Sequence, residues 1–422
     1  MSKPHFTTYA GGFPVLQIPR EGTEAVTAQF FFDVGARHER PDENGLAHFT
    51  EHMVFKGGKT YQTAQAVADT VNKVGGYTNA YTSHEVTSFY VKSAAERVSV
   101  GLDVMSDYLA RPNFDAAELE KERGVIIEEI NRANDDPSDQ LAELMGRTRH
   151  GDHPLGRDVL GTKERIKAMP RDYFVEWTNR FYTPQNGILA LTGNLSAVTD
   201  ELLNEITSRF TATGKGSPEP AKPHQGSQVA VLKKDIEQTH LGITVSAPHY
   251  GDREAVAILD VLSMILGGNM SSRLFHRIRE QQGLCYTVFS MPDLQIDDGV
   301  LYIYAGVPND KADHALAAIY AELHRMASGD LTDEELQIGK ESLKGNRALR
   351  LEDSTSLGTY YAMQQLKLGE YETPQTMAER VDAVTAEQII SLAKKLFVDD
   401  GLSVGVVGPQ QQAAFERYAT LG

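Results

Sequence analysis

The chain has 422 residues, 41% of them hydrophobic, and its 58 acidic and 41 basic residues give a net charge of −17 at pH 7. This acidic excess disfavours nucleic acid as a partner, and no apolar run approaches the length of a membrane span. A single cysteine excludes disulfides within the chain and fits a reducing compartment. Because the N-terminus also lacks the features of a secretory signal, we expect a soluble, cytoplasmic protein of two or three domains.

The first informative motif is the pentad H-F-T-E-H at residues 48–52. On a helix, His48 and His52 are four residues apart and lie on one face, with Glu51 beside His52. Two imidazoles placed in this way can share one metal ion, and a neighbouring carboxylate can carry a proton. The pentad predicts the core of a zinc peptidase site, which needs a third ligand because catalytic zinc usually has three protein ligands and one water.

A long amphipathic helix is predicted from residue 115, with Asp115 as the N-cap and apolar residues at core spacing. It carries several acids that could supply the third ligand. Glu122 and Glu129 are seven residues apart and share one face, whereas Glu128 points about 100° away from Glu129. Helical spacing alone does not choose between Glu128 and Glu129.

Several sequence blocks, in matching order and spacing, resemble the inverzincin peptidases, which include pitrilysin, insulin-degrading enzyme and the mitochondrial processing peptidase. The blocks are residues 35–39, 44–58, 79–83, 122–130, 153–157 and 182–187. The resemblance implies that Glu129 is the third zinc ligand and that Glu122 supports the site from outside the ligand set. It also implies that Glu51 takes a proton from water and later delivers one to the leaving amine.

A block in the second half, residues 272–286, resembles the same family. The resemblance implies that Arg279 and Tyr286 act at the active site, where they position the substrate and stabilise the transition state. A cation and a phenolic donor suit an oxyanion that zinc alone only partly neutralises. The only cysteine, Cys285, stands where relatives commonly have alanine, and we expect a small buried residue rather than a nucleophile.

The segment Asn79, Ala80, Tyr81 and Thr82 resembles the edge strand along which relatives bind substrate as an added β-strand. This binding mode requires an extended peptide and depends little on side-chain identity. We therefore expect short unfolded peptides as substrates, and folded proteins should be cleaved poorly.

The chain contains an internal repeat, since residues 378–384 echo residues 163–169 at an offset of 215. A stretch rich in Gly, Pro and Ser separates the two copies. These patterns predict a zinc-binding domain at 1–213, a linker at 214–227 and a homologous second domain at 228–422. The expected fold is α+β, with two duplicated α/β domains whose antiparallel-rich sheets pack against helices and form half of a clamshell.

The repeat also indicates where metal is absent. The positions equivalent to His48, Glu51 and His52 are Ile258, Val261 and Leu262, and Asn346 corresponds to Glu129. Because these equivalent positions hold no His, Cys, Asp or Glu, we expect one catalytic zinc ion per chain.

Three hypotheses follow for the assembly. The favoured one is a homodimeric peptidase in which, by analogy with longer relatives, the zinc half of one chain faces the Arg279/Tyr286 half of its partner. The second is a catalytic subunit that needs a separate partner chain. In relatives with two different subunits, the pentad and the Arg/Tyr pair tend to lie on different chains, whereas this chain contains both. The third is a non-catalytic scaffold subunit, which the intact pentad disfavours.

Overall fold

The computed structural model describes residues 4–421, which form two compact units. The first unit comprises the residues up to Arg132 together with 158–219 and 350–371, and the second comprises 133–157, 220–349 and the residues from Glu372 onward. Among the described residues, no helix combines the length and apolar character needed to cross a lipid bilayer.

The first unit is built on a six-stranded sheet in the order β1-β2-β6-β3-β5-β4. Neighbouring strands are antiparallel except for the parallel pair β2 and β6. Every residue of β6 is buried, as expected for a continuous apolar strand covered on both faces, whereas β4 lies at the edge. The strands are β1 (His5–Thr8), β2 (Pro14–Pro19), β3 (Ala25–Phe32), β4 (Tyr77–Thr82), β5 (Thr87–Ala94) and β6 (Gly187–Gly193).

Helices cover both faces of this sheet. On one face, Phe49, Tyr108 and Trp177 belong to a large core contributed by several helices of the first half of the chain. On the other face, Phe31 and Ile188 belong to a smaller core completed by α12 from far along the chain. The helices of the unit are α1 (Leu46–Val54), α2 (Ala64–Asn72), α3 (Val98–Ala110), α4 (Ala116–Asp135, entering the second unit after Arg132), α6 (Lys163–Ala168), α7 (Arg171–Phe181), α8 (Asp200–Thr207) and α12 (Ser354–Leu368).

The second unit repeats this topology. Its five-stranded sheet has the order β7-β11-β8-β10-β9, which corresponds strand by strand to β2-β6-β3-β5-β4. The only parallel pair in the described sheet, β7 and β11, again occupies the equivalent place. The duplicated α+β fold expected from the sequence is therefore present. The strands are β7 (Gln228–Lys233), β8 (Gln238–Ser246), β9 (Thr287–Leu294), β10 (Gly299–Pro308) and β11 (Ser403–Gly408).

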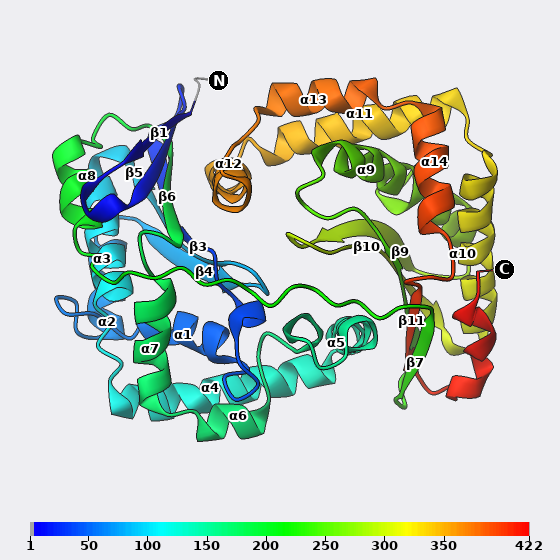
Figure 1. The fold of residues 1–422 in the computed structure, drawn as a ribbon, viewed down its shortest axis with the longest axis horizontal. Coiled ribbons are helices and arrows are strands. Elements are labelled where there is room, and N and C mark those ends of the chain that lie inside the picture. Colours follow the sequence, from blue (N-terminus) through cyan, green and yellow to red (C-terminus); the bar gives the residue numbers. More distant parts are fainter. Residues whose placement is uncertain (1–3, 422) are drawn as a thin grey trace. The chain divides into compact units, whose positions relative to one another are not determined.

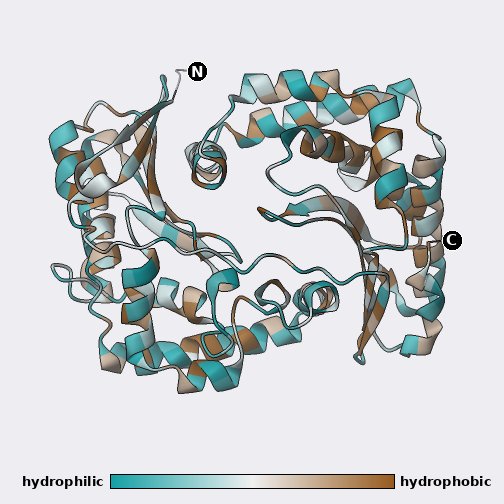
Figure 2. Ribbon diagram, in the orientation of Figure 1, coloured by the Kyte–Doolittle hydropathy of each residue, from teal (hydrophilic) through white to brown (hydrophobic). Residues whose placement is uncertain are grey.

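The core of the second unit lies between its sheet and α9, which is coloured largely brown for its hydrophobic residues in Figure 2. Leu259, Val261 and Leu262 of α9 are fully buried there. The helices are α5 (Pro137–His150), α9 (Arg253–Gly267), α10 (Ala312–Ser328), α11 (Asp333–Arg350), α13 (Pro374–Ala383) and α14 (Ala386–Leu396).

The two repeats exchange one helix each (Figure 1). Helix α5 follows α4 in the first half of the chain but packs on β7, β8 and β11 of the second unit. Its counterpart α12 follows α11 in the second half but packs on β3 and β6 of the first unit. The division of the sequence into two copies, at 1–213 and 228–422 with a linker at 214–227, stays a prediction. The compact units do not follow this division, because α5 of the first copy belongs to the second unit and α12 of the second copy belongs to the first unit.

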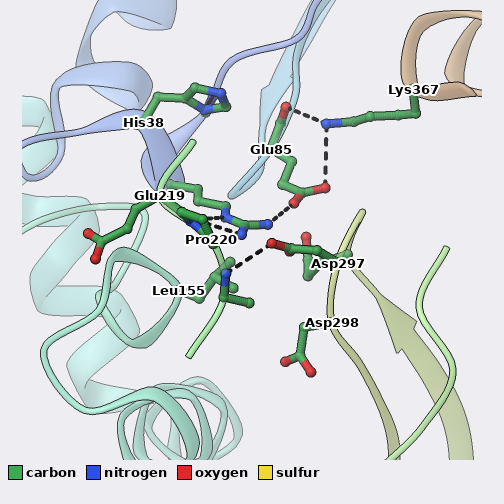
Figure 3. Close-up of polar contacts among 12 residues, drawn as sticks. His38, Glu85, Leu155, Glu219, Pro220, Asp297, Asp298 and Lys367 are labelled. Atoms are coloured by element: carbon green, nitrogen blue, oxygen red, sulfur yellow. Dashed lines mark hydrogen bonds and ion pairs between the residues drawn. The ribbon is translucent and has the colours of Figure 1, made fainter. Parts of the chain in front are cut away.

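Ion pairs fix α12 to the first unit. Lys367 Nζ lies 2.6 Å from Asp33 and 3.4 Å from the carboxylate of Glu85. Glu85, which is labelled with Lys367 in Figure 3, also pairs with the buried Arg37. Arg37 donates a 2.7 Å hydrogen bond to the carbonyl oxygen of Glu219. Such buried pairs hold a helix in register because separating them would leave charges unpaired.

Residues 214–227, the predicted linker, form neither helix nor strand.

Candidate metal centre

Helix α1 carries the pentad, and a buried carboxylate holds its N-terminus. Glu39 accepts hydrogen bonds from the backbone N–H groups of Gly45 (2.9 Å) and Ala47 (2.7 Å), which satisfy donors that a helix start leaves free. Burial raises the pKa of Glu39 to about 8, although these hydrogen bonds oppose the shift. Gly45 has φ +93°, and a Cβ there would lie 2.7 Å from the Leu160 carbonyl oxygen, so glycine is required. Sequence reasoning missed this role of Glu39, because its partners are six to eight residues away.

The structure brings His48 and His52 together with Glu129 of α4. Glu129 Oε2 lies 3.7 Å from His48 Nε2 and 3.6 Å from His52 Nε2. One potential ligand atom from each of the three residues lies within 4.8 Å of the other two, and among residues 4–421 no other such cluster of metal-ligand residues occurs. Glu128 is exposed to solvent. The assignment of the three clustered residues as ligands stays a prediction, and the geometry favours Glu129 over Glu128.

These three residues fit a zinc ion. Tetrahedral ligands about 2.0–2.2 Å from zinc lie roughly 3.3–3.6 Å apart, close to the distances found here. Glu129 Oε2 is buried and has no hydrogen-bond partner among the described residues, as expected of an atom that faces a cation. Burial, with the neighbouring His52, lowers the pKa of His48 to about 3, so its imidazole is neutral at pH 7, the form that binds metal.

Glu122 supports His52 from outside the cluster. Its Oε1 lies 2.9 Å from His52 Nδ1, and its Oε2 lies 2.6 Å from the ammonium of Lys56. Burial opposes ionisation of Glu122, but the hydrogen bonds from His52 and Lys56 outweigh it, and the pKa of Glu122 is lowered. An anionic acceptor at Nδ1 orients the ring so that Nε2 faces Glu129. Sequence reasoning did not assign Lys56 a role, although its position four residues after His52 was a usable signal.

We expect Glu122→Gln to weaken metal binding or activity about 10- to 100-fold, because the amide removes the negative charge opposite His52 and Lys56. Zinc affinity measured by competition with a chelating dye would show the change. Glu128→Gln is the matched control, since this exposed acid lies on the same helix and should leave the affinity unaltered. Equal zinc affinities of Glu122→Gln and Glu128→Gln would contradict a role of Glu122 in metal binding.

Glu51 lies beside the ligands and is held by strand β4. The hydroxyl of Thr82 donates a 2.5 Å hydrogen bond to Glu51 Oε2. Burial raises the pKa of Glu51 above its usual value, although the Thr82 hydrogen bond and the charge of His52 act in the opposite direction. A carboxylate with a raised pKa can act as a proton carrier.

The predicted substrate strand is the edge strand β4, which contains Asn79, Ala80, Tyr81 and Thr82. It pairs with β5 on one side only, with Asn79 opposite Tyr90. An edge strand has free backbone groups that an added peptide can use. Substrate binding by these four residues stays a prediction.

Arg279 and Tyr286 belong to the second unit and lie next to each other. The Arg279 guanidinium is 5.2 Å from the centre of the Tyr286 ring and 4.5 Å from that of Phe275. Tyr286 is 76% exposed. Cys285 is buried, and burial raises the pKa of its thiol to about 11, as expected for an unreactive cysteine.

Comparisons with known proteins find relatives of both halves of the chain. The family description insulinase (peptidase family M16) matches residues 15–163, and peptidase M16 inactive domain matches residues 168–343. An uncharacterized zinc protease of Bacillus subtilis, YmxG, is 34% identical over 89% of this chain and 91% of its own length. Another uncharacterized zinc protease, from Rickettsia bellii, is 33% identical over 96% of this chain and 97% of its own length.

Two solved structures share the fold. A protease from Helicobacter pylori superposes with a TM-score of 0.87 at 24% identity, covering 96% of this chain and 99% of its own. A peptidase M16 inactive domain from Pseudomonas fluorescens has a TM-score of 0.87 at 16% identity, covering 97% and 99%. These likenesses extend over both halves of the chain.

Proposed function

Because this chain belongs to the insulinase (M16) family of peptidases, as the sequence resemblance indicated, we propose that it is a zinc-dependent endopeptidase that cleaves short, unfolded peptides. The observation that carries the proposal is the cluster of His48, His52 and Glu129, in which the buried Glu129 Oε2 has no hydrogen-bond partner among the described residues. Glu51 lies beside this cluster. The relatives' names, which call them zinc proteases, support the metal and the reaction class.

In the proposed reaction, His48, His52 and Glu129 would hold one zinc ion per chain, which when bound would lower the pKa of water and polarise the scissile carbonyl. Glu51 accepts the proton of the attacking water on its carboxylate, while the Thr82 hydroxyl holds Oε2 in place. Glu51 then donates the proton to the leaving amine. Arg279 and Tyr286 are proposed to stabilise the oxyanion and position the substrate.

Removal of the metal tests this proposal. We expect a chelator to abolish hydrolysis of an unstructured peptide and added zinc to restore it, because the water would otherwise keep a pKa far above neutrality. Activity should follow bound zinc, measured by mass spectrometry of the metal, up to one ion per chain. Full hydrolysis by protein proven free of metal would contradict the proposal.

For the assembly we propose a homodimer with shared active sites, formed in the cytoplasm, with a heterodimeric catalytic subunit as the alternative. The proposal depends on the presence of both the pentad and the Arg279/Tyr286 pair in one chain, so that two copies have all the parts of two sites. The mass of the purified protein in solution distinguishes a homodimer from a subunit that needs a partner.

Mixing two inactive variants tests the sharing of sites. A Glu51→Gln chain and an Arg279→Ala/Tyr286→Phe chain should each be nearly inactive, but after subunit exchange about half the dimers are mixed and each has one intact site. Activity should recover to roughly a quarter of that of the unmodified protein. Absence of recovery, with mixed dimers proven by native mass spectrometry, would mean that each site forms within one chain.

A further inference from the structure

The edge strand β4 has two chemically different faces. Side chains alternate along a strand, and here Ala80 packs against the large core of the first unit while Thr82 contacts Glu51. The opposite face carries Tyr77, 50% exposed, and Tyr81, 39% exposed. Two partly exposed tyrosines therefore share one face of the strand that reaches the catalytic carboxylate.

The outer edge of β4 is open to an added strand. Ala80 N–H is hydrogen-bonded at 2.8 Å to Asn79 Oδ1, a side-chain oxygen of its own strand, and β4 has no neighbour beyond β5 in the described sheet. The backbone groups of alternate residues point to the same side, so those of Thr78 and Thr82 lie along the same free edge as Ala80. A peptide paired there would pass Thr82 and hence Glu51.

Such a peptide would have to place side chains against the tyrosine face. Directly opposite residues of paired strands have Cβ atoms about 4.5–5.5 Å apart and lie on the same face. Tyr77 and Tyr81 are four residues apart, so they would meet two substrate side chains that are also four residues apart. Tyr90 of β5 extends the surface, since its ring lies 6.1 Å from that of Tyr77 in an edge-to-face arrangement.

The cation on this face already has an acidic partner. Lys92 is directly opposite Tyr77 in the β4–β5 pair and therefore lies on the same face, where its ammonium is 3.0 Å from Asp353. Because that charge is balanced, the exposed rings of Tyr77 and Tyr81 are the surface left for substrate side chains, and large apolar or aromatic side chains suit it.

We propose that Tyr77 and Tyr81 determine substrate preference by favouring aromatic or large apolar residues at two peptide positions four residues apart. This inference rests on the proposed peptidase function and adds a substrate class to it. It also assigns specificity to side chains on a strand whose backbone supplies most of the binding.

The test is a profile of peptide cleavage with a library in which each position around the scissile bond varies. We expect preference for aromatic residues at two positions four apart, with Tyr77→Ala abolishing one preference and Tyr81→Ala the other. Each loss should lower kcat/KM for the aromatic substrate by about two- to fivefold, the size of one cross-strand pair. The conservative variants Tyr77→Phe and Tyr81→Phe should keep the preference.

Phe6→Ala is the matched control, because Phe6 is 41% exposed on β1, the opposite edge strand of the same sheet. It should leave the profile unaltered. A flat profile, or one that the tyrosine variants do not alter position by position, would overturn this inference while leaving the metal-dependent hydrolysis intact. Failure to cleave any peptide with zinc bound would instead contradict the proposed function.

Discussion

Glu51→Gln should lower peptide hydrolysis by about 10²- to 10⁴-fold while zinc remains bound, because the amide keeps the shape of the side chain but cannot accept a proton. The contacts of Glu51 support this separation, since its carboxylate bonds to Thr82 and takes no part in the cluster of His48, His52 and Glu129. Turnover numbers and the zinc content of the same preparation check the prediction. Near-normal turnover would remove Glu51 as the base.

The ligand variants are the contrasting set. His48→Ala, His52→Ala and Glu129→Ala should lose both zinc and activity, because each removes one of three ligand atoms. Glu128→Ala should keep both, since Glu128 is exposed. If Glu128→Ala lost zinc and Glu129→Ala retained it, the third ligand would have to be reassigned.

Because α5 and α12 are exchanged between the repeats, a core substitution in either helix should destabilise the unit whose sheet comes from the other half of the chain. Leu357 of α12 is fully buried in the core that also contains Phe31 and Ile188 of the first unit. Leu357→Ala should cost about 2–5 kcal/mol through lost burial and the cavity that remains. Hydrogen exchange should accelerate in β3 and β6 rather than in β8 and β11.

Helix α5 gives the converse result. Leu141 is fully buried with Met145 and Val407, so Leu141→Ala should destabilise β7, β8 and β11 of the second unit. Leu349→Ala is the matched control, because Leu349 is 75% exposed and its loss should change stability by about 0.5 kcal/mol or less. The opposite result would be faster hydrogen exchange in the second unit for Leu357→Ala and in the first unit for Leu141→Ala. It would mean that each helix is packed in the unit formed by its own half of the sequence.

Much of the candidate metal centre could be predicted before the fold was known. The pentad fixes the relation of His48, Glu51 and His52 because helical geometry is local, and these residues do lie on α1. Asp115 accepts hydrogen bonds from the backbone N–H groups of Ala117 and Glu118, as the predicted N-cap of α4 requires. The repeat likewise predicted two similar domains, and the two sheets share one strand order.

Other features depend on contacts between distant segments. Helical spacing left Glu128 and Glu129 as equal candidates, and only the packing of α4 against α1 turns Glu129 toward the histidines. The hydrogen bond from Thr82 to Glu51 joins a strand to a helix 31 residues earlier, and no local pattern indicates it.

The sequence by itself determined the pentad helix, the helix that follows Asp115, the candidate ligands and the duplication, because these depend on periodicity and on residue types at fixed spacing. The tertiary structure alone decided which sheet each helix covers. Leu141 of α5 and Leu357 of α12 are both fully buried, but burial of apolar side chains is non-directional and does not specify the partner. That choice depends on the complementary apolar faces of β3 and β6 for α12, and of β8 and β11 for α5.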